Sequence, residues 1–264
     1  MAFACKDPAL TYLNKYGYNV VKLPRTGIDP LLVLGRDTAL NPIGQLETVW
    51  KAPTPPPAPG APKKAVNIEG QKSDKLDLSI GLKLLANALA AFGATTPSLD
   101  FAYRKARKVQ FTFTNTTSVG IDPFVVGEYL ATGDLNMRNP FVARYFDNDD
   151  STAYIVTEVL KSDTVIVTAT DSKETGVTLD VPAISNVVGA NVKVTGGGDS
   201  SGTLTYKGPE AVTFGFRAFE LVYVNGRWSV QGVKADGGMA FFHDEANGEQ
   251  ASGAIFNAGG LVRL

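Results

Sequence analysis

Two long stretches in the middle of the chain, residues 99–117 and 151–170, alternate apolar and polar side chains. In the first stretch, Val109, Phe111 and Phe113 fall on one face, and polar residues fall on the other. This period of two is typical of a β-strand that has one wet face. An ordinary strand has about 5 to 6 residues, whereas a strand that crosses a membrane needs roughly 9 to 11. Both stretches are long enough to cross a membrane, and both also fit a large twisted sheet in water.

The second stretch repeats the alternation. One face carries Tyr154, Val156, Leu160, Ile166 and Thr168, and the opposite face carries Ile155, Val159, Val165, Val167 and Ala169. Because alternation is common in sheets of every kind, the pattern predicts a long strand but not its surroundings.

The composition is that of a folded protein and argues against several classes of partner. The chain has 264 residues, of which 44% are hydrophobic and 19% are charged, and its net charge is -1. Nucleic-acid binding normally needs a basic excess, so we expect no nucleic-acid partner. Asp7 and Pro8 precede any useful apolar run, which argues against a secretory signal and predicts a cytosolic protein. The chain also lacks a window of about 18 to 20 uninterrupted apolar residues, so no membrane-spanning helix is expected.

Residues for catalysis or metal binding are few. The chain has one histidine, His243, on an expected polar linker, and one cysteine, Cys5, far from it in sequence. A catalytic triad needs a well-oriented base, and zinc needs several histidine or cysteine ligands. The acidic run at residues 147–151 resembles a calcium loop, but Thr152 stands where that loop requires glycine. A glycosidase carboxylate pair would converge only in the fold. We therefore expect no enzymatic activity, no metal and no separate cofactor.

Shorter signals predict local elements. Residues 122–131 begin with Asp-Pro and predict a helix, and residues 183–189 predict a short one. The Asn-Gly pair at residues 225–226 lies between two apolar runs and is a strong hairpin signal. Residues 52–64 are rich in proline, which predicts an extended surface loop because proline fits neither helix interiors nor paired strands.

Residues 76–92 satisfy two periods at once. A strand pattern places together Leu76, Leu78, Ile80, Leu82 and Leu84, whereas a helical stripe joins Leu78, Leu82, Leu85, Leu89 and Phe92. The simpler interpretation is a strand to about residue 80 followed by an alanine-rich helix to Gly93. The alternative is a segment that changes from helix to strand on membrane insertion.

The next segment carries a local basic cluster. Its members are Arg104, Lys105, Arg107 and Lys108, beside Phe101 and Tyr103. Anionic lipid headgroups attract such clusters by about 1 kcal/mol per basic side chain. The cluster therefore predicts contacts with anionic lipids, and a solvated strand end is the other interpretation.

Two segments near the N-terminus resemble the opening of bacterial gasdermins. They are Gly-Tyr-Asn-Val-Val-Lys-Leu-Pro-Arg at residues 17–25 and Gly-Ile-Asp-Pro-Leu-Leu-Val-Leu at residues 27–34. A cysteine ahead of a short helix, here Cys5, is part of the same resemblance. The resemblance implies an α+β fold, with a twisted, mainly antiparallel central sheet, short surrounding helices and a short C-terminal inhibitory tail. It also implies a palmitoyl group on Cys5, although an unmodified buried cysteine is the alternative.

The resemblance further implies a function. Residues 1–242 would be the pore-forming domain, and residues 243–264 would be a linker and an autoinhibitory peptide. A caspase-like protease encoded nearby would remove the peptide, and the inactive cytoplasmic monomer would become a homo-oligomeric β-barrel in the lipids of the inner membrane. The resulting cell death would serve as defence against phage. A non-enzymatic β-rich binding module, such as an adhesin-like domain, is the alternative.

Residue roles follow from this implied mechanism. Cleavage is expected beside Asp244, Glu245 or Asn247. The autoinhibitory contacts are expected from Ile255, Phe256, Leu261, Val262 and Leu264. Membrane strands are expected within residues 76–117 and 151–194 and include Leu78, Ile80, Phe111, Phe113, Ile155, Val165 and Val167.

Overall fold

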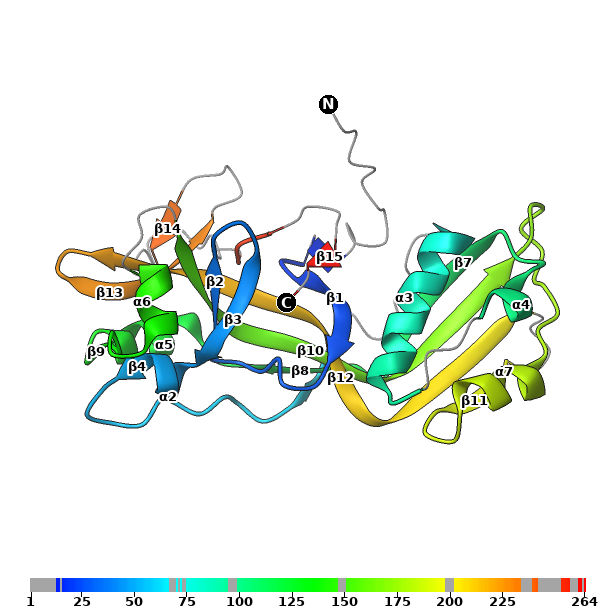
Figure 1. The fold of residues 1–264 in the computed structure, drawn as a ribbon, viewed down its shortest axis with the longest axis horizontal. Coiled ribbons are helices and arrows are strands. Elements are labelled where there is room, and N and C mark those ends of the chain that lie inside the picture. The colour runs from blue at the N-terminus through cyan, green and yellow to red at the C-terminus, as the bar shows by residue number, and fades with distance from the viewer. Residues whose placement is uncertain are drawn as a thin grey trace, which may run out of the picture.

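The structure is a computed structural model, and it describes residues 13–14, 16–66, 70, 72, 75–94, 99–146, 151–197, 202–233, 239–241, 253–256, 261–262 and 264. Within these residues, two long antiparallel strands form the spine of a large sheet: β10 (Thr152–Thr170) and β12 (Thr203–Val224). Short helices lie around this sheet (Figure 1). The predicted α+β fold with a mainly antiparallel central sheet is confirmed.

One end of the spine, on the left in Figure 1, is here called the body. Its strands are β2 (Leu32–Arg36), β3 (Leu40–Gln45), β4 (Trp50–Lys51), β8 (Thr117–Gly120), β9 (Asp134–Leu135), β13 (Arg227–Val233) and β14 (Met239–Phe241). Its helices are α2 (Leu46–Val49), α5 (Pro123–Leu130) and α6 (Pro140–Phe146).

The other end of the spine, on the right in Figure 1, is here called the distal half. Beside the ends of β10 and β12 it holds β6 (Leu76–Asp77), α3 (Leu78–Ala91), α4 (Asp100–Tyr103), β7 (Lys108–Thr114), α7 (Val181–Val188) and β11 (Lys193–Gly196). Two strands lie near the middle, β1 (Asn19–Arg25) and β15 (Leu261–Val262), while β5 (Lys63–Lys64) pairs with β8. β1 pairs with β12 on one side and with β15, in parallel, on the other.

The long strand predicted over residues 151–170 is confirmed, but its two faces need a correction. The pairing of β10 with β12 shifts register between Val156 and Glu158, which marks a β-bulge. A bulge adds one residue and so moves the following side chains to the opposite face. Val159 therefore packs with Tyr154 and Val156, and not with Ile155 as uninterrupted alternation would place it.

The prediction of one long strand over residues 99–117 is wrong. This stretch forms α4, then β7, then β8. Leu99 and Tyr103 are four residues apart and both buried, because one helical turn brings them to the same side. Between β7 and β8, Asn115 has a φ of 55°, a left-handed conformation that interrupts the strand.

Residues 76–92 are mainly helical. The expected strand to residue 80 is shorter, because β6 ends at Asp77 and α3 begins at Leu78. Helix α3 buries Leu82, Leu85 and Leu89 against the distal sheet. Gly81 allows this packing, since a Cβ at that position would collide with the side chain of Val109.

The remaining local predictions agree with the structure. Helix α5 begins after Asp122, whose carboxylate accepts a hydrogen bond from the backbone N–H of Phe124 at 2.9 Å. Helix α7 begins at Val181 rather than at residue 183, because Asp180 caps it. The turn at residues 225–226 joins β12 to β13. The loop predicted over residues 52–64 forms neither helix nor strand over residues 52–62, but its last two residues form β5, which pairs with β8. In the described part of the chain, no helix has the length and hydropathy needed to cross a membrane.

Candidate functional site

The described part of the C-terminal tail, residues 253–256, 261–262 and 264, lies against β1 and β12. Its first hydrogen bond runs from the backbone N–H of Ala254 to the carbonyl oxygen of Ala218, at 2.8 Å. The side chain of Asn19, at the start of β1, then binds the tail twice. Its Nδ2 donates to the carbonyl oxygen of Ala254 at 2.8 Å, and its Oδ1 accepts from the backbone N–H of Phe256 at 2.9 Å. The fully buried Asn19 amide thus pairs with the tail much as a neighbouring strand would.

The apolar side chains of the tail extend the same contact. The ring of Phe256 meets Tyr154 edge-on, with ring centroids 4.6 Å apart, and lies 6.0 Å from the ring of Phe216. Val262 is buried in the cluster formed by these residues, and Leu264 packs against it. In β15, Leu261 and Val262 pair with Val20 and Val21 of β1. The tail therefore covers one face of β10 and β12 and one edge of β1.

Ile255 does not share this packing. Its side chain is 36% exposed, whereas Ala254 and Phe256 on either side of it pack against the sheet. The reason is the extended backbone, which turns successive side chains to opposite sides. Ile255 is thus corrected from an expected buried contact to a surface residue.

A charged cluster lies directly under the start of the tail. Arg217 forms an ion pair with Glu158 at 3.0 Å, donates to the carbonyl oxygen of Tyr16 at 2.7 Å, and places its guanidinium 4.6 Å from the ring centre of Tyr18. Burial and the nearby Glu158 carboxylate raise the pKa of Tyr18 well above its usual range. A Cβ at Gly253 would lie 2.6 Å from the Cγ of Arg217, so glycine lets the tail approach closely.

Sequence reasoning missed the sheet side of this contact. Asn19 and Tyr154 lie far from the tail in sequence, Phe216 and Arg217 belong to a different strand, and no local pattern links any of them to it. One signal was present, because asparagine is unfavourable in strands and Asn19 stands between apolar residues.

Replacement of Asn19 by alanine tests the tail contact. Two backbone groups of the tail would lose their partners, which costs about 1 to 3 kcal/mol for a buried group. We expect faster amide exchange at Phe256 in Asn19→Ala. Asn191→Ala is the control, since it removes an exposed amide that donates to the carbonyl oxygen of Gly93, away from the tail. Equal tail exchange in both variants would contradict the role of Asn19.

A narrow apolar cavity of about 60 Å³ lies between α3, β1 and the sheet. The side chains that line it are apolar and comprise Leu13, Val20, Val21, Pro24, Leu84, Ala88, Phe111, Phe113, Val165 and Phe214. The rings of Phe113 and Phe214 stack across one another at 4.3 Å. Leu13, which follows Cys5 in sequence, lines this cavity. Cys5 itself lies outside the described residues, as do Asp244, Glu245 and Asn247.

The other predicted residues lie mainly in the distal half. Arg104, Lys105, Arg107 and Lys108 are all exposed, and Phe101 beside them is 45% exposed. The expected membrane strands are covered in this state, because Phe111, Val165 and Val167 are buried under α3. Phe113 packs against the same core, Leu78 and Ile80 belong to α3, and Ile155 is buried in the body.

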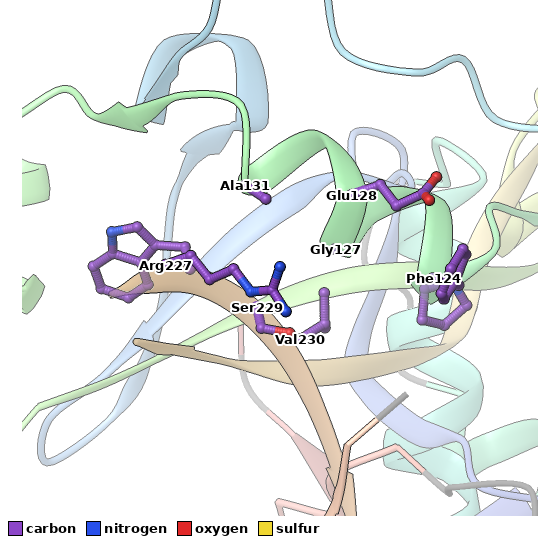
Figure 2. A pocket seen from close by; sticks show the side chains of 9 residues that line it. Phe124, Gly127, Glu128, Ala131, Arg227, Ser229 and Val230 are labelled. Carbon is purple, nitrogen blue, oxygen red and sulfur yellow. The ribbon is translucent and has the colours of Figure 1, made fainter. Parts of the chain in front are cut away.

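A second hollow, of about 330 Å³, separates α5 from β13. Figure 2 shows Glu128 and Phe124 projecting from α5, and Arg227 and Ser229 on the facing strand. None of the residues expected to have a function lines it. Among the described residues, no group of three or more histidine, cysteine, aspartate or glutamate side chains is arranged to hold a metal ion.

Comparisons with known proteins agree with this arrangement. The chain matches the family model of the Bacterial Gasdermin Family over residues 21–236. It is 38% identical over 263 residues to Gasdermin bGSDM of Vitiosangium sp. (strain GDMCC 1.1324), with 98% of each chain covered. It is 34% identical over 239 residues to Gasdermin bGSDM of Lysobacter enzymogenes, with 89% of this chain and 88% of the relative covered.

A solved structure agrees with the fold. The chain superposes on a bacterial gasdermin from Bradyrhizobium tropiciagri with a TM-score of 0.65 and 16% sequence identity, over 86% of this chain and 91% of the other. At this identity the likeness concerns the fold alone, while the family match rests on the sequence. The chain therefore belongs to the bacterial gasdermins, a family of pore-forming proteins.

Proposed function

We propose that this chain is the autoinhibited precursor of a membrane pore. The observation that carries the proposal is the tail, which is held by the Asn19 amide and by the packing of Phe256 and Val262 on β10 and β12. Proteolysis within residues 242–252 would release the tail. The freed chains would then assemble into a β-barrel in the inner membrane, and the leak would kill the cell as a defence against phage.

The energetics of the tail suit a proteolytic switch. Each fully buried apolar side chain contributes about 1.5 to 3 kcal/mol, while ordering one residue costs about 1 to 2 kcal/mol. The net affinity of a short tail is therefore small. A tethered tail experiences an effective concentration of the order of millimolar, and cleavage removes that advantage without altering a single contact.

The direct test compares the full chain with a chain that ends at residue 252, using dye-loaded vesicles that contain anionic lipid. The shorter chain should release dye, and the full chain should not. If neither chain releases dye, and circular dichroism shows that the shorter chain is folded, the proposal is contradicted and a β-rich binding module is favoured.

We further propose that Cys5 carries a palmitoyl group. The apolar cavity supports this, because Leu13, which follows Cys5 in sequence, lines it and the cavity can accept the end of an acyl chain. Each methylene group of such a chain contributes about 0.8 kcal/mol when it enters lipid. We expect the intact mass from the native cell to exceed that of the polypeptide by one acyl group, and Cys5→Ser to release dye more slowly after tail removal. An unmodified mass in leakage-competent protein would contradict this.

The basic cluster gives the proposal a membrane-facing surface. Helix α4 lies at the tip of the distal half in Figure 1, and Arg104, Lys105, Arg107 and Lys108 follow it in sequence, up to the start of β7. We propose that this tip approaches anionic lipids first, with the exposed ring of Phe101 entering the interface.

A further inference from the structure

The central sheet is interrupted at one level across three neighbouring strands. β10 pairs with β8 as far as Lys161 and with β7 from Thr164 onward, so residues 162–163 face the break between these two strands. On its other side, β10 pairs Ser162 with Val212 and then Thr164 with Lys207. Residues 208–211 of β12 are thus left over opposite a single residue of β10, Asp163. We call residues 115–116, 162–163 and 208–211 the break line.

The sequence makes continuous pairing at the break line unfavourable. Asn115 adopts a positive φ, which strands avoid. Pro209 has no N–H to donate to a neighbouring strand. Gly208 lies against the ring of Phe92, where a Cβ would come within 2.5 Å of the ring carbons. The interruption therefore follows from the residues present on these strands.

One carboxylate connects all three strands at this level. The Oδ1 of Asp163 accepts hydrogen bonds from the Nδ2 of Asn115 at 2.9 Å and from the Oγ1 of Thr164 at 2.6 Å. Its Oδ2 lies 3.7 Å from the Nζ of Lys207 on β12. Burial raises the pKa of the Asp163 carboxyl, but these hydrogen bonds and Lys207 outweigh burial and hold the pKa below its usual value.

The side chain of Ser162 adds two more hydrogen bonds at the break line. Its Oγ accepts from the backbone N–H of Thr164 at 3.0 Å and lies 2.7 Å from the carbonyl oxygen of Thr114, to which it donates. These bonds replace the missing strand pairing with side-chain bonds. Side-chain bonds can be broken individually, whereas a continuous ladder opens only cooperatively.

We propose that the break line is a hinge between the body and the distal half, and that Asp163 is the latch that holds it closed. Besides the latch, the contacts of α3 with β1 also join the distal half to the middle of the molecule, through Leu84, Ala88, Val20 and Val21 around the apolar cavity. Opening the hinge parts the ends of β10 and β12, together with β7, from the body and loosens the backbone pairing among these three strands. The hinge follows from the strand pairing of the resting fold and is independent of the proposed function.

Hydrogen exchange on the full-length chain tests the hinge. Asp163→Asn removes the charge and weakens bonds to all three strands. We expect amides in residues 108–114, 164–170 and 203–207 to exchange about tenfold faster, the effect of losing one hydrogen bond to a charged group. Amides in residues 154–160 of the body should keep their rates.

The matched control is Asp37→Asn. Asp37 is similarly buried, with its side chain 22% exposed against 17% for Asp163, and its carboxylate is paired with Arg144 at 2.7 Å in the body. This variant should leave the distal amides unchanged. If Asp163→Asn accelerates all amides equally, or none, the hinge is refuted.

Two milder variants keep the test decisive if Asp163→Asn fails to fold. Thr164→Val and Lys207→Gln each remove one contact of the latch and should accelerate the same distal amides to a smaller degree. Unchanged distal exchange in both would refute the latch. The hinge and the pore function can fail separately. Faster distal exchange in Asp163→Asn, together with a tail-less chain that leaves vesicles intact, would support the hinge and contradict the proposed pore function.

Discussion

Full-length Phe256→Asp should release dye from anionic vesicles without any protease, at a rate close to that of the chain lacking its tail. The Phe256 ring packs between Tyr154 and Phe216, and its partial burial contributes less than the roughly 1.5 to 3 kcal/mol of full burial. An aspartate there loses this contribution and adds the cost of burying a charge. Because the net affinity of the tail is small, one such change should be enough to free it.

The neighbouring residue supplies the control. Ile255→Asp introduces the same charge one position away, at a side chain that is already exposed. It should leave the full chain silent. Equal leakage from both variants would show that charge anywhere in the tail activates the protein, and silence from a folded Phe256→Asp would contradict inhibition by this contact.

Reversing the charge of the basic cluster should greatly weaken binding to anionic vesicles. Replacing Arg104, Lys105, Arg107 and Lys108 with glutamate removes four attractions of about 1 kcal/mol each. We therefore expect binding of the tail-less chain to anionic vesicles to weaken about 10³-fold in a sedimentation assay. The loss should shrink as salt is added, because screening weakens the original attraction.

A control variant tests whether vesicle binding depends on where the basic residues lie or only on the net charge of the chain. The control replaces four exposed basic residues of the body with glutamate, namely Arg36, Lys51, Arg138 and Arg227. It changes the net charge by the same amount and should weaken binding much less. If the two quadruple variants bind equally, the tip of the distal half is not the membrane-facing surface.

The strand β10 could be predicted from the sequence because long segments of it alternate between polar and apolar residues. Its bulge near Thr157 could not, since a bulge is set by pairing with β12, a strand about 50 residues away along the chain. The same limit applies to residues 99–117, where Leu99 and Tyr103 fit a strand pattern by spacing but are packed by a helical turn.

Of the candidate site, the tail residues could be predicted from the sequence, but the sheet residues that they contact could not. Phe256, Val262 and Leu264 stand out as apolar residues after a polar linker, whereas Asn19 and Phe216 become visible only when β1 and β12 are folded together. The residues expected in membrane strands cannot be tested by simple charge substitution. Phe111 and Val165 are core residues in this structure, so a charge at either would unfold the resting protein before it could report on a lipid-facing role.

The central claim is that the attached tail alone prevents pore formation. Its most direct test uses a chain with a protease recognition sequence inserted within residues 242–252, so that the same folded molecules are measured before and after one cut. Dye release should begin only after the protease is added, and it should follow the appearance of the two fragments by mass spectrometry. Complete cleavage without dye release, or equal release before the cut, would contradict the account.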